Sequence, residues 1–141
     1  MDELQLARLI KKCKLLKTKF VGVYPSDKFP PNLQDNAFVI VNASPTPSPG
    51  SHWLLLCKRR GKLYFADPLA LNVSVYTHIY RRLSQHNLVL HELMTERLQP
   101  LKSTSCGYIC IYVAKFLFGP HSPTVPIITE TDLFRFLKHM K

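Results

Sequence analysis

The chain has 141 residues, enough for one domain with a single hydrophobic core, and its 46% hydrophobic and 20% charged residues are ordinary for a globular protein. Nineteen Lys and Arg residues against nine Asp and Glu residues give a net charge of +10, which favours a polyanionic partner or else serves only solubility. We expect neither a membrane protein nor a disulfide-stapled secreted one, because no apolar run nears ~18 residues, no secretory signal is visible and the four cysteines form no CxxC pair.

The first predicted element is an amphipathic helix over residues 2–20, because its apolar residues recur at i, i+3 and i+4. These residues are Leu6, Leu9, Ile10, Cys13, Leu16 and Phe20. The other side is basic, with Arg8, Lys11, Lys12, Lys14, Lys17 and Lys19. Such a cluster is typical of a solvated helix face and equally of a polyanion-binding stripe.

The next segments alternate loop and strand. Residues 21–36, which contain prolines and aspartates, are predicted to form a loop, and the apolar run Ala37–Asn42 a short strand. The proline-rich residues 44–50 are predicted to form a flexible or polyproline-like surface loop. With no internal repeat in the sequence, we expect one domain over residues 1–141.

Two apolar runs predict a β-hairpin. They are Trp53–Lys58 and Lys62–Ala66, and the Arg-Arg-Gly sequence between them is typical of a turn. The central turn residues are either Arg59 and Arg60 or Arg60 and Gly61, and the two choices differ in strand register.

This hairpin brings His52 and Asp67 together at its open end. In the first register the two residues are directly opposed, and in the second they are diagonal neighbours on the same face. A carboxylate beside one ring nitrogen fixes the tautomer of an imidazole and leaves the other nitrogen free to act as a base. The alternative is that Asp67 only starts a turn and that His52 only precedes a strand.

The following segment is predicted to contain a helix and a strand. Residues 74–87 form the helix, with Val75, Ile79 and Leu83 on its apolar side. Residues 87–94 form the strand, and a short helix over residues 132–140 closes the chain.

The most informative stretch is residues 98–118. Three N-cap candidates at 103–105 precede Cys106, and an apolar run then continues until Gly119, so a helix with Cys106 in its first turn is predicted. Its only charge is Lys115, and a helix that is apolar nearly all round is a buried one.

A cysteine in the first turn of a helix suits nucleophilic chemistry. The positive end of the helix dipole favours the reactive thiolate, and unpaired backbone N–H groups there can receive an oxyanion. The side-chain amide of Gln99, seven residues before Cys106, is a candidate for a further oxyanion donor. Equally, Cys106 fits the pattern of a small buried hydrophobe, which is common for cysteine.

The order of these motifs resembles the adenovirus maturation protease family (adenain), within the clan of ubiquitin-like-protein proteases. The motifs are His52-Trp53, Asp67-Pro68, Gln99 and Cys106-Gly107. Further similar segments are Phe20-Val-Gly-Val-Tyr, Lys28-Phe-Pro and Val39-Ile-Val-Asn42-Ala43, so that the resemblance covers residues 3–137. It implies an α+β fold with a central, mainly antiparallel sheet flanked by helices, and a nucleophile at the start of a buried helix.

The resemblance also implies residue roles. Cys106 would be the nucleophile, His52 the general base, Asp67 the residue that orients it and Gln99 part of the oxyanion hole. Trp53 is a candidate for lining the substrate cleft, or alternatively a core residue. The family often has glutamate where this chain has Asp67, a change that keeps the carboxylate.

The implied function is a cysteine endopeptidase that cleaves viral precursor proteins near glycine during particle maturation, in the virion and the host nucleus. We expect a monomer that requires no cofactor or metal. Double-stranded DNA would bind without sequence specificity and act as activator, through Lys11, Lys12, Arg59 and Arg60. Any activating peptide would not be disulfide-linked, because residues 86–98 contain no cysteine.

Three alternatives remain open. A protease that removes ubiquitin-like modifiers would use the same triad. A DNA-binding core protein with an inactive protease fold would have the same charge, although the presence of all four expected site residues argues against it. A zinc site formed by His52, Cys106 and Cys110 lacks the paired CxxC that is typical of such sites.

Overall fold

The computed structural model describes residues 2–45, 52–93 and 106–119. Within these residues the class is α+β, as predicted. The elements in chain order are α1 (Glu3–Lys11), β1 (Phe20–Tyr24), β2 (Ala37–Asn42), β3 (Trp53–Arg59), β4 (Lys62–Ala66), the 3₁₀ turn η1 (Val73–Val75), α2 (Thr77–Gln85), β5 (Leu90–Glu92) and α3 (Cys106–Phe118). No helix in the described ranges is both long and apolar enough to cross a membrane.

The five strands form one mixed sheet in the order β1-β2-β3-β4-β5. The pairs β2–β3 and β3–β4 are antiparallel, whereas β1–β2 and β4–β5 are parallel. The sheet is therefore mixed, which corrects the prediction of a mainly antiparallel sheet. Both edge strands are reached through long crossover connections, and such connections place strands parallel.

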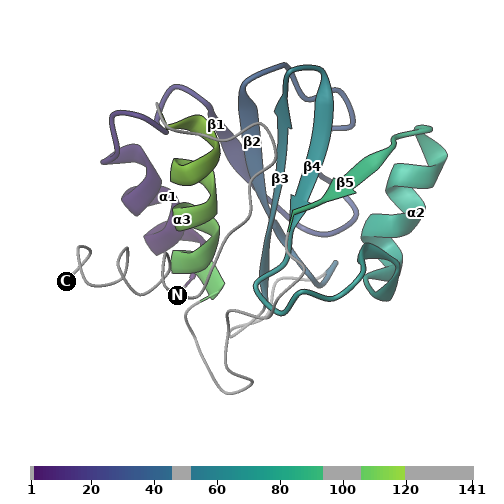
Figure 1. Cartoon of the computed structure of the whole chain (residues 1–141). Helices are drawn as coiled ribbons and strands as arrows, with labels where there is room; N and C mark the ends of the chain where they lie inside the picture. The colour runs from purple at the N-terminus through teal and green to yellow at the C-terminus, as the bar shows by residue number, and fades with distance from the viewer. Residues whose placement is uncertain (1, 46–51, 94–105, 120–141) are drawn as a thin grey trace.

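Helices cover both faces of this sheet (Figure 1), with α1 and α3 on one side and α2 on the other. The strand alternation divides the core accordingly. On the α1 and α3 side the sheet contributes Phe38, Ile40, Trp53, Leu55, Cys57 and Ala66. On the α2 side it contributes Ala37, Val39, Val41, Leu54, Leu56 and Phe65. Because both faces are covered, β2 is buried at every position.

The β3–β4 hairpin adopts the second of the two predicted registers. Arg59 pairs with Lys62, so the central turn residues are Arg60 and Gly61, with φ of 54° and 75°. Two positive φ angles define a type I′ turn, whose twist matches that of the flanking strands. In this register Leu55 lies opposite Ala66. His52 and Asp67 are consequently diagonal neighbours at the open end of the hairpin.

The N-terminal helix is shorter than predicted, since α1 ends at Lys11 rather than at Phe20. Turns follow it, held by backbone hydrogen bonds such as Leu16 N–H to Cys13 O, and Leu16 remains buried. Phe20 instead opens β1, a strand within the segment predicted to be a loop. Pairing of β1 with β2 overrides the helical periodicity, and the Val-Gly-Val-Tyr sequence was the available strand signal.

The α2 segment also differs in detail. The helix begins at Thr77, and Val75 lies in η1 with 57% of its surface exposed, so its predicted place on the apolar side is wrong. Ile79 and Leu83 are buried as predicted. The strand expected over residues 87–94 is reduced to β5, and the predicted helix over 132–140 and most of the proline-rich loop lie outside the described residues.

Candidate active site

The sheet and α3 bring His52, Asp67 and Cys106 together. His52 directly precedes β3, Asp67 directly follows β4, and Cys106 is the first residue of α3, which packs against β3. The His52 Nε2 atom lies 2.6 Å from Asp67 Oδ1, and a second hydrogen bond joins the imidazole to the Cys106 thiol. The three side chains thus form a chain from sulfur through imidazole to carboxylate.

The Asp67 side chain accepts four hydrogen bonds although only 2% of the residue is exposed. Its Oδ1 receives the His52 ring and the Leu69 N–H at 2.9 Å, and its Oδ2 receives the Leu71 N–H at 3.3 Å. The bond to Leu69 is an Asx turn, so Asp67 both starts a turn and orients His52. Burial raises the pKa of this carboxyl, but the hydrogen bonds from His52, Tyr76 and Leu69 outweigh it and hold the pKa below 3.8.

Tyr76 completes the shell around the carboxylate, and the sequence analysis missed it. Its hydroxyl donates to Asp67 Oδ2 at 2.5 Å, and its ring stacks on His52 with centroids 6.2 Å apart. Burial and the neighbouring Asp67 raise the pKa of the phenol above 10.0, so the hydroxyl stays a donor. No motif surrounds Tyr76, and only the path of the chain through η1 brings it back to the site.

The imidazole of His52 is positioned as a cation. Burial disfavours its charged form, but the hydrogen bonds and charges of Asp67 and Cys106 outweigh burial and raise the pKa of His52 to about 9. Because Nε2 is bonded to Asp67, the ring nitrogen left to face Cys106 is Nδ1.

The sulfur of Cys106 is correspondingly stabilised as a thiolate. Burial raises its pKa, but the His52 hydrogen bond, the backbone N–H groups of Trp53 and Gly107 and the charge of His52 together lower it below 9.0. The carbonyl oxygen of Trp53 also accepts a hydrogen bond from the Cys110 thiol, with the sulfur 3.4 Å from the oxygen. One residue of β3 therefore binds two cysteines one turn apart and fixes the start of α3 against the sheet.

Cys57 and Cys110 lack this environment. Burial raises the pKa of Cys57 to about 12 and that of Cys110 well above 9.0. All four cysteines of the chain are free thiols. No group of three His, Cys, Asp or Glu side chains suited to a metal ion occurs among the described residues.

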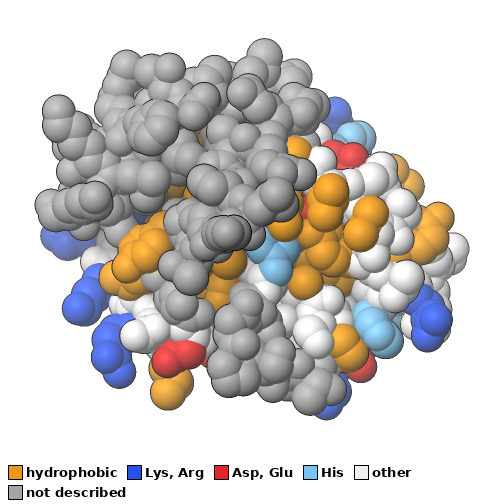
Figure 2. All heavy atoms as spheres, turned by 90° about the horizontal axis from the view of Figure 1, so that it is seen from below, with side chains coloured by type: hydrophobic (Ala, Val, Ile, Leu, Met, Phe, Trp, Pro, Cys, Tyr) orange, Lys and Arg blue, Asp and Glu red, His pale blue; other side chains and the backbone are white. Residues whose placement is uncertain are grey.

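The remaining predicted site residues lie elsewhere. The Trp53 side chain is 6% exposed and belongs to the core, which is one of the two places that the sequence left open for it. A contact of its indole with substrate stays a prediction. Gln99 and the N-cap candidates at 103–105 lie outside the described residues. Figure 2, the view from below, shows Lys and Arg side chains around the edge of that face and hydrophobic side chains with a histidine towards its middle.

The predicted DNA-binding residues lie away from the triad. Arg59 and Arg60 are at the hairpin turn, the end of β3 opposite to His52. Lys11 and Lys12 end α1, and the chain that follows reaches this same end of the sheet at Lys19, whose carbonyl binds the Phe38 N–H.

Iodoacetamide should label Cys106 first among the four cysteines, because the His52 hydrogen bond and charge lower the pKa of its thiol, whereas burial raises the pKa values of Cys57 and Cys110. The rate should rise with pH to a plateau whose midpoint lies below 9.0, and His52→Ala should move that midpoint upward by removing a hydrogen bond and a charge. Peptide mapping by mass spectrometry identifies the labelled residue. Labelling led by Cys13 or Cys57 would contradict the assignment.

Tyr76→Phe should lower the free energy of unfolding by about 1.5 kcal/mol, because the buried Asp67 carboxylate loses a donor. Urea denaturation measures this change. The matched control is Tyr80→Phe, since Tyr80 is 50% exposed and its hydroxyl makes no hydrogen bond within the described residues. Equal effects of the two substitutions would show that the Tyr76 hydroxyl contributes nothing specific.

Comparison with known proteins adds no family assignment: no protein-family model matches the sequence, and no curated protein matches it.

Proposed function

We propose that the protein is a cysteine endopeptidase. The observation that supports this most strongly is the chain of hydrogen bonds from Cys106 through His52 to the buried Asp67. A thiol of lowered pKa beside an imidazole of raised pKa is the arrangement that activates a cysteine nucleophile. A buried carboxylate that orients the imidazole completes the triad arrangement.

In the proposed reaction, the Cys106 thiolate attacks the carbonyl carbon of the scissile peptide. The carbonyl oxygen becomes an oxyanion, which N–H donors at the start of α3 and the Gln99 amide stabilise. The His52 imidazolium then gives its proton to the leaving amine as the C–N bond breaks, which leaves a thioester on Cys106. Water, deprotonated by the now neutral His52, attacks the thioester, and the released thiolate and imidazolium return to their starting state.

The proposed substrates are viral precursor and structural proteins, cut near glycine in extended segments during particle maturation. This part of the proposal rests on the resemblance of the His-Trp, Asp-Pro and Cys-Gly motifs to the adenain family. A protease for ubiquitin-like modifiers shares the triad, and the choice of substrate separates the two functions.

Cys106→Ala should abolish cleavage of short glycine-containing peptides without unfolding the protein, whereas the control Cys13→Ala should cleave normally. Gln99→Ala should lower kcat by roughly 10²–10³-fold yet leave alkylation of Cys106 nearly unchanged, since alkylation develops no oxyanion. Cleavage is followed by mass spectrometry, and folding by circular dichroism. Efficient cleavage of intact ubiquitin-like conjugates alone would favour the modifier protease, and activity in Cys106→Ala would refute the nucleophile.

We further propose that double-stranded DNA binds the end of the sheet at the hairpin turn, near Arg59 and Arg60, and raises this activity. The net charge of +10 supports the proposal, as does the position of Arg60 on the exposed hairpin turn, remote from the triad. No ion pair within the described part of the chain neutralises Lys11, Lys12 or Arg60. Phosphate contacts from such side chains would bind DNA without sequence preference.

The affinity for duplex DNA should have a Kd on the order of 10⁻⁴–10⁻⁶ M at physiological salt, and its logarithm should fall linearly with log salt by about 0.9 per phosphate neutralised. Reversal of Lys11, Lys12, Arg59 and Arg60 to Glu should remove binding and stimulation but leave basal cleavage intact. Fluorescence anisotropy measures binding.

The matched single variants for this test are Arg60→Glu and Lys28→Glu. Both residues are exposed. Lys28, however, lies at the end of the sheet opposite to the hairpin turn, because the nearby Ser26 N–H bonds to the carbonyl of Ser44, which follows β2. Only Arg60→Glu should weaken DNA binding markedly. A salt slope near zero, or equal activity with and without DNA at low salt, would leave the charge as a solubility feature.

A further inference from the structure

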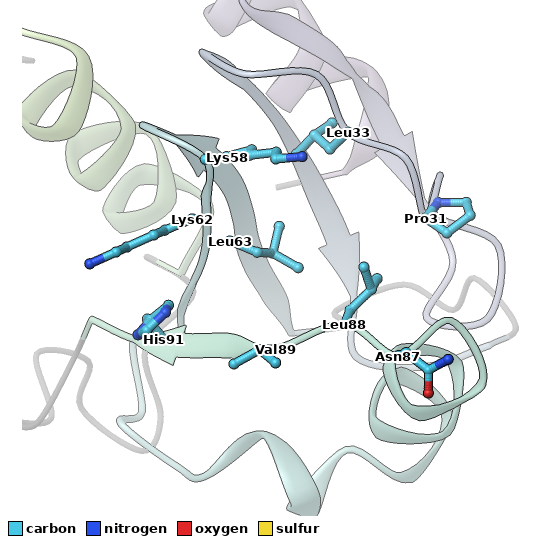
Figure 3. Close-up of a pocket in the computed structure, with 10 residues that line it drawn as sticks. Pro31, Leu33, Lys58, Lys62, Leu63, Asn87, Leu88, Val89 and His91 are labelled. Carbon is cyan, nitrogen blue, oxygen red and sulfur yellow. The ribbon is translucent and has the colours of Figure 1, made fainter.

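A pocket of about 230 Å³ lies on the α2 side of the sheet, near the hairpin turn (Figure 3). Its wall includes Lys58 and Leu63, which pair across β3 and β4. Lys58 lies six residues along the chain from His52, about 20 Å at the rise of a β-strand. The pocket is therefore separate from the candidate active site.

The floor of the pocket is apolar. Leu33 is buried in the core of the α2 side, and Leu63 and Leu88 are half-buried and pack against the same core. Val89 stands at the mouth with 76% of its surface exposed. Three leucines fixed by the core offer a preformed surface to an aliphatic group.

The charged group over this floor is Lys58. The strand alternation places it on the same face as Leu54 and Leu56, where the pattern calls for a third apolar residue. In Figure 3 its side chain extends across the pocket towards Leu33. No residue that lines the pocket is acidic, and Lys58 forms no ion pair with any residue that the structure describes.

Lys62 also lines the pocket but is placed differently. It neighbours Leu63 in β4 and so projects from the opposite face, and in Figure 3 its amine points away from the cavity. The two lysines carry the same charge, yet only one of them is directed over the apolar floor.

We propose that this pocket binds a small free carboxylate with a short aliphatic chain. The anionic head would pair with the Lys58 ammonium, and the chain would lie on Leu33, Leu63 and Leu88. The volume is below the ~300–1,000 Å³ of pockets for drug-sized ligands, which limits the occupant to a smaller molecule. This site is independent of the proposed peptidase activity.

Hexanoate is the probe, titrated into the 141-residue protein while the methyl signals are followed by NMR. Saturable shifts are expected at Leu33, Leu63, Leu88 and Val89, with a Kd on the order of 1 mM for a ligand of this size. Hexan-1-ol and hexylammonium serve as uncharged and cationic controls and should bind at least about fivefold more weakly. Equal binding of hexan-1-ol, or shifts confined to other residues, would overturn the proposal.

Three variants separate the pocket from general charge effects. Lys58→Met keeps an unbranched apolar side chain and should weaken hexanoate binding about tenfold, whereas Lys62→Met should change it less than about twofold. Val89→Asp places a carboxylate at an exposed position of the mouth, where the fold tolerates it, and should also abolish binding. Equal losses from the two lysine variants, or full binding by Val89→Asp, would refute the assignment.

Discussion

The buried carboxylate of Asp67 is the constraint on which the candidate site depends. A carboxylate that is 2% exposed is destabilising unless its lone pairs are filled, and here four donors fill them. The donors come from the segment before β3, from the turn after β4 and from Tyr76 at the start of α2. Satisfying this one charge therefore fixes three separate parts of the chain relative to one another, and with them the orientation of His52.

The far end of the hairpin sets the geometry at this end. The Arg60-Gly61 turn makes His52 and Asp67 diagonal neighbours rather than direct partners. Diagonal positions on a sheet are roughly 7–8 Å apart, which leaves room for an imidazole to lie between the two chains. The distal nitrogen Nε2 can then meet the carboxylate while Nδ1 turns towards α3. This register requires Arg60 to adopt a left-handed backbone conformation, which is unfavourable for a residue other than glycine.

How much the sequence predicts depends on the range of the interactions. The strands Ala37–Asn42 and Lys62–Ala66, and the helix from Cys106, follow from local pattern, and the His52–Asp67 contact follows from counting residues about a turn. The N-terminal helix and β1 were mispredicted because strand pairing with β2 decides them. Tyr76 was missed because its approach to Asp67 depends on the path of the chain through η1. The contact of His52 with Cys106 spans 54 residues, and only the resemblance to a known family suggested it.

The charges of the site follow from its proton count. When Asp67 is ionised and Cys106 is a thiolate, protonated His52 is the cation between two anions, and loss of its proton would leave both without a counter-charge. That is why the pKa of His52 rises to about 9 despite burial. Protonated His52, together with the backbone N–H groups of Trp53 and Gly107, in turn lowers the pKa of Cys106. Tyr76 cannot replace this proton, because its own pKa is raised. One shared proton thus sets both the nucleophile and the acid that the proposed cleavage requires, and the buried Asp67 holds that proton on His52 at neutral pH.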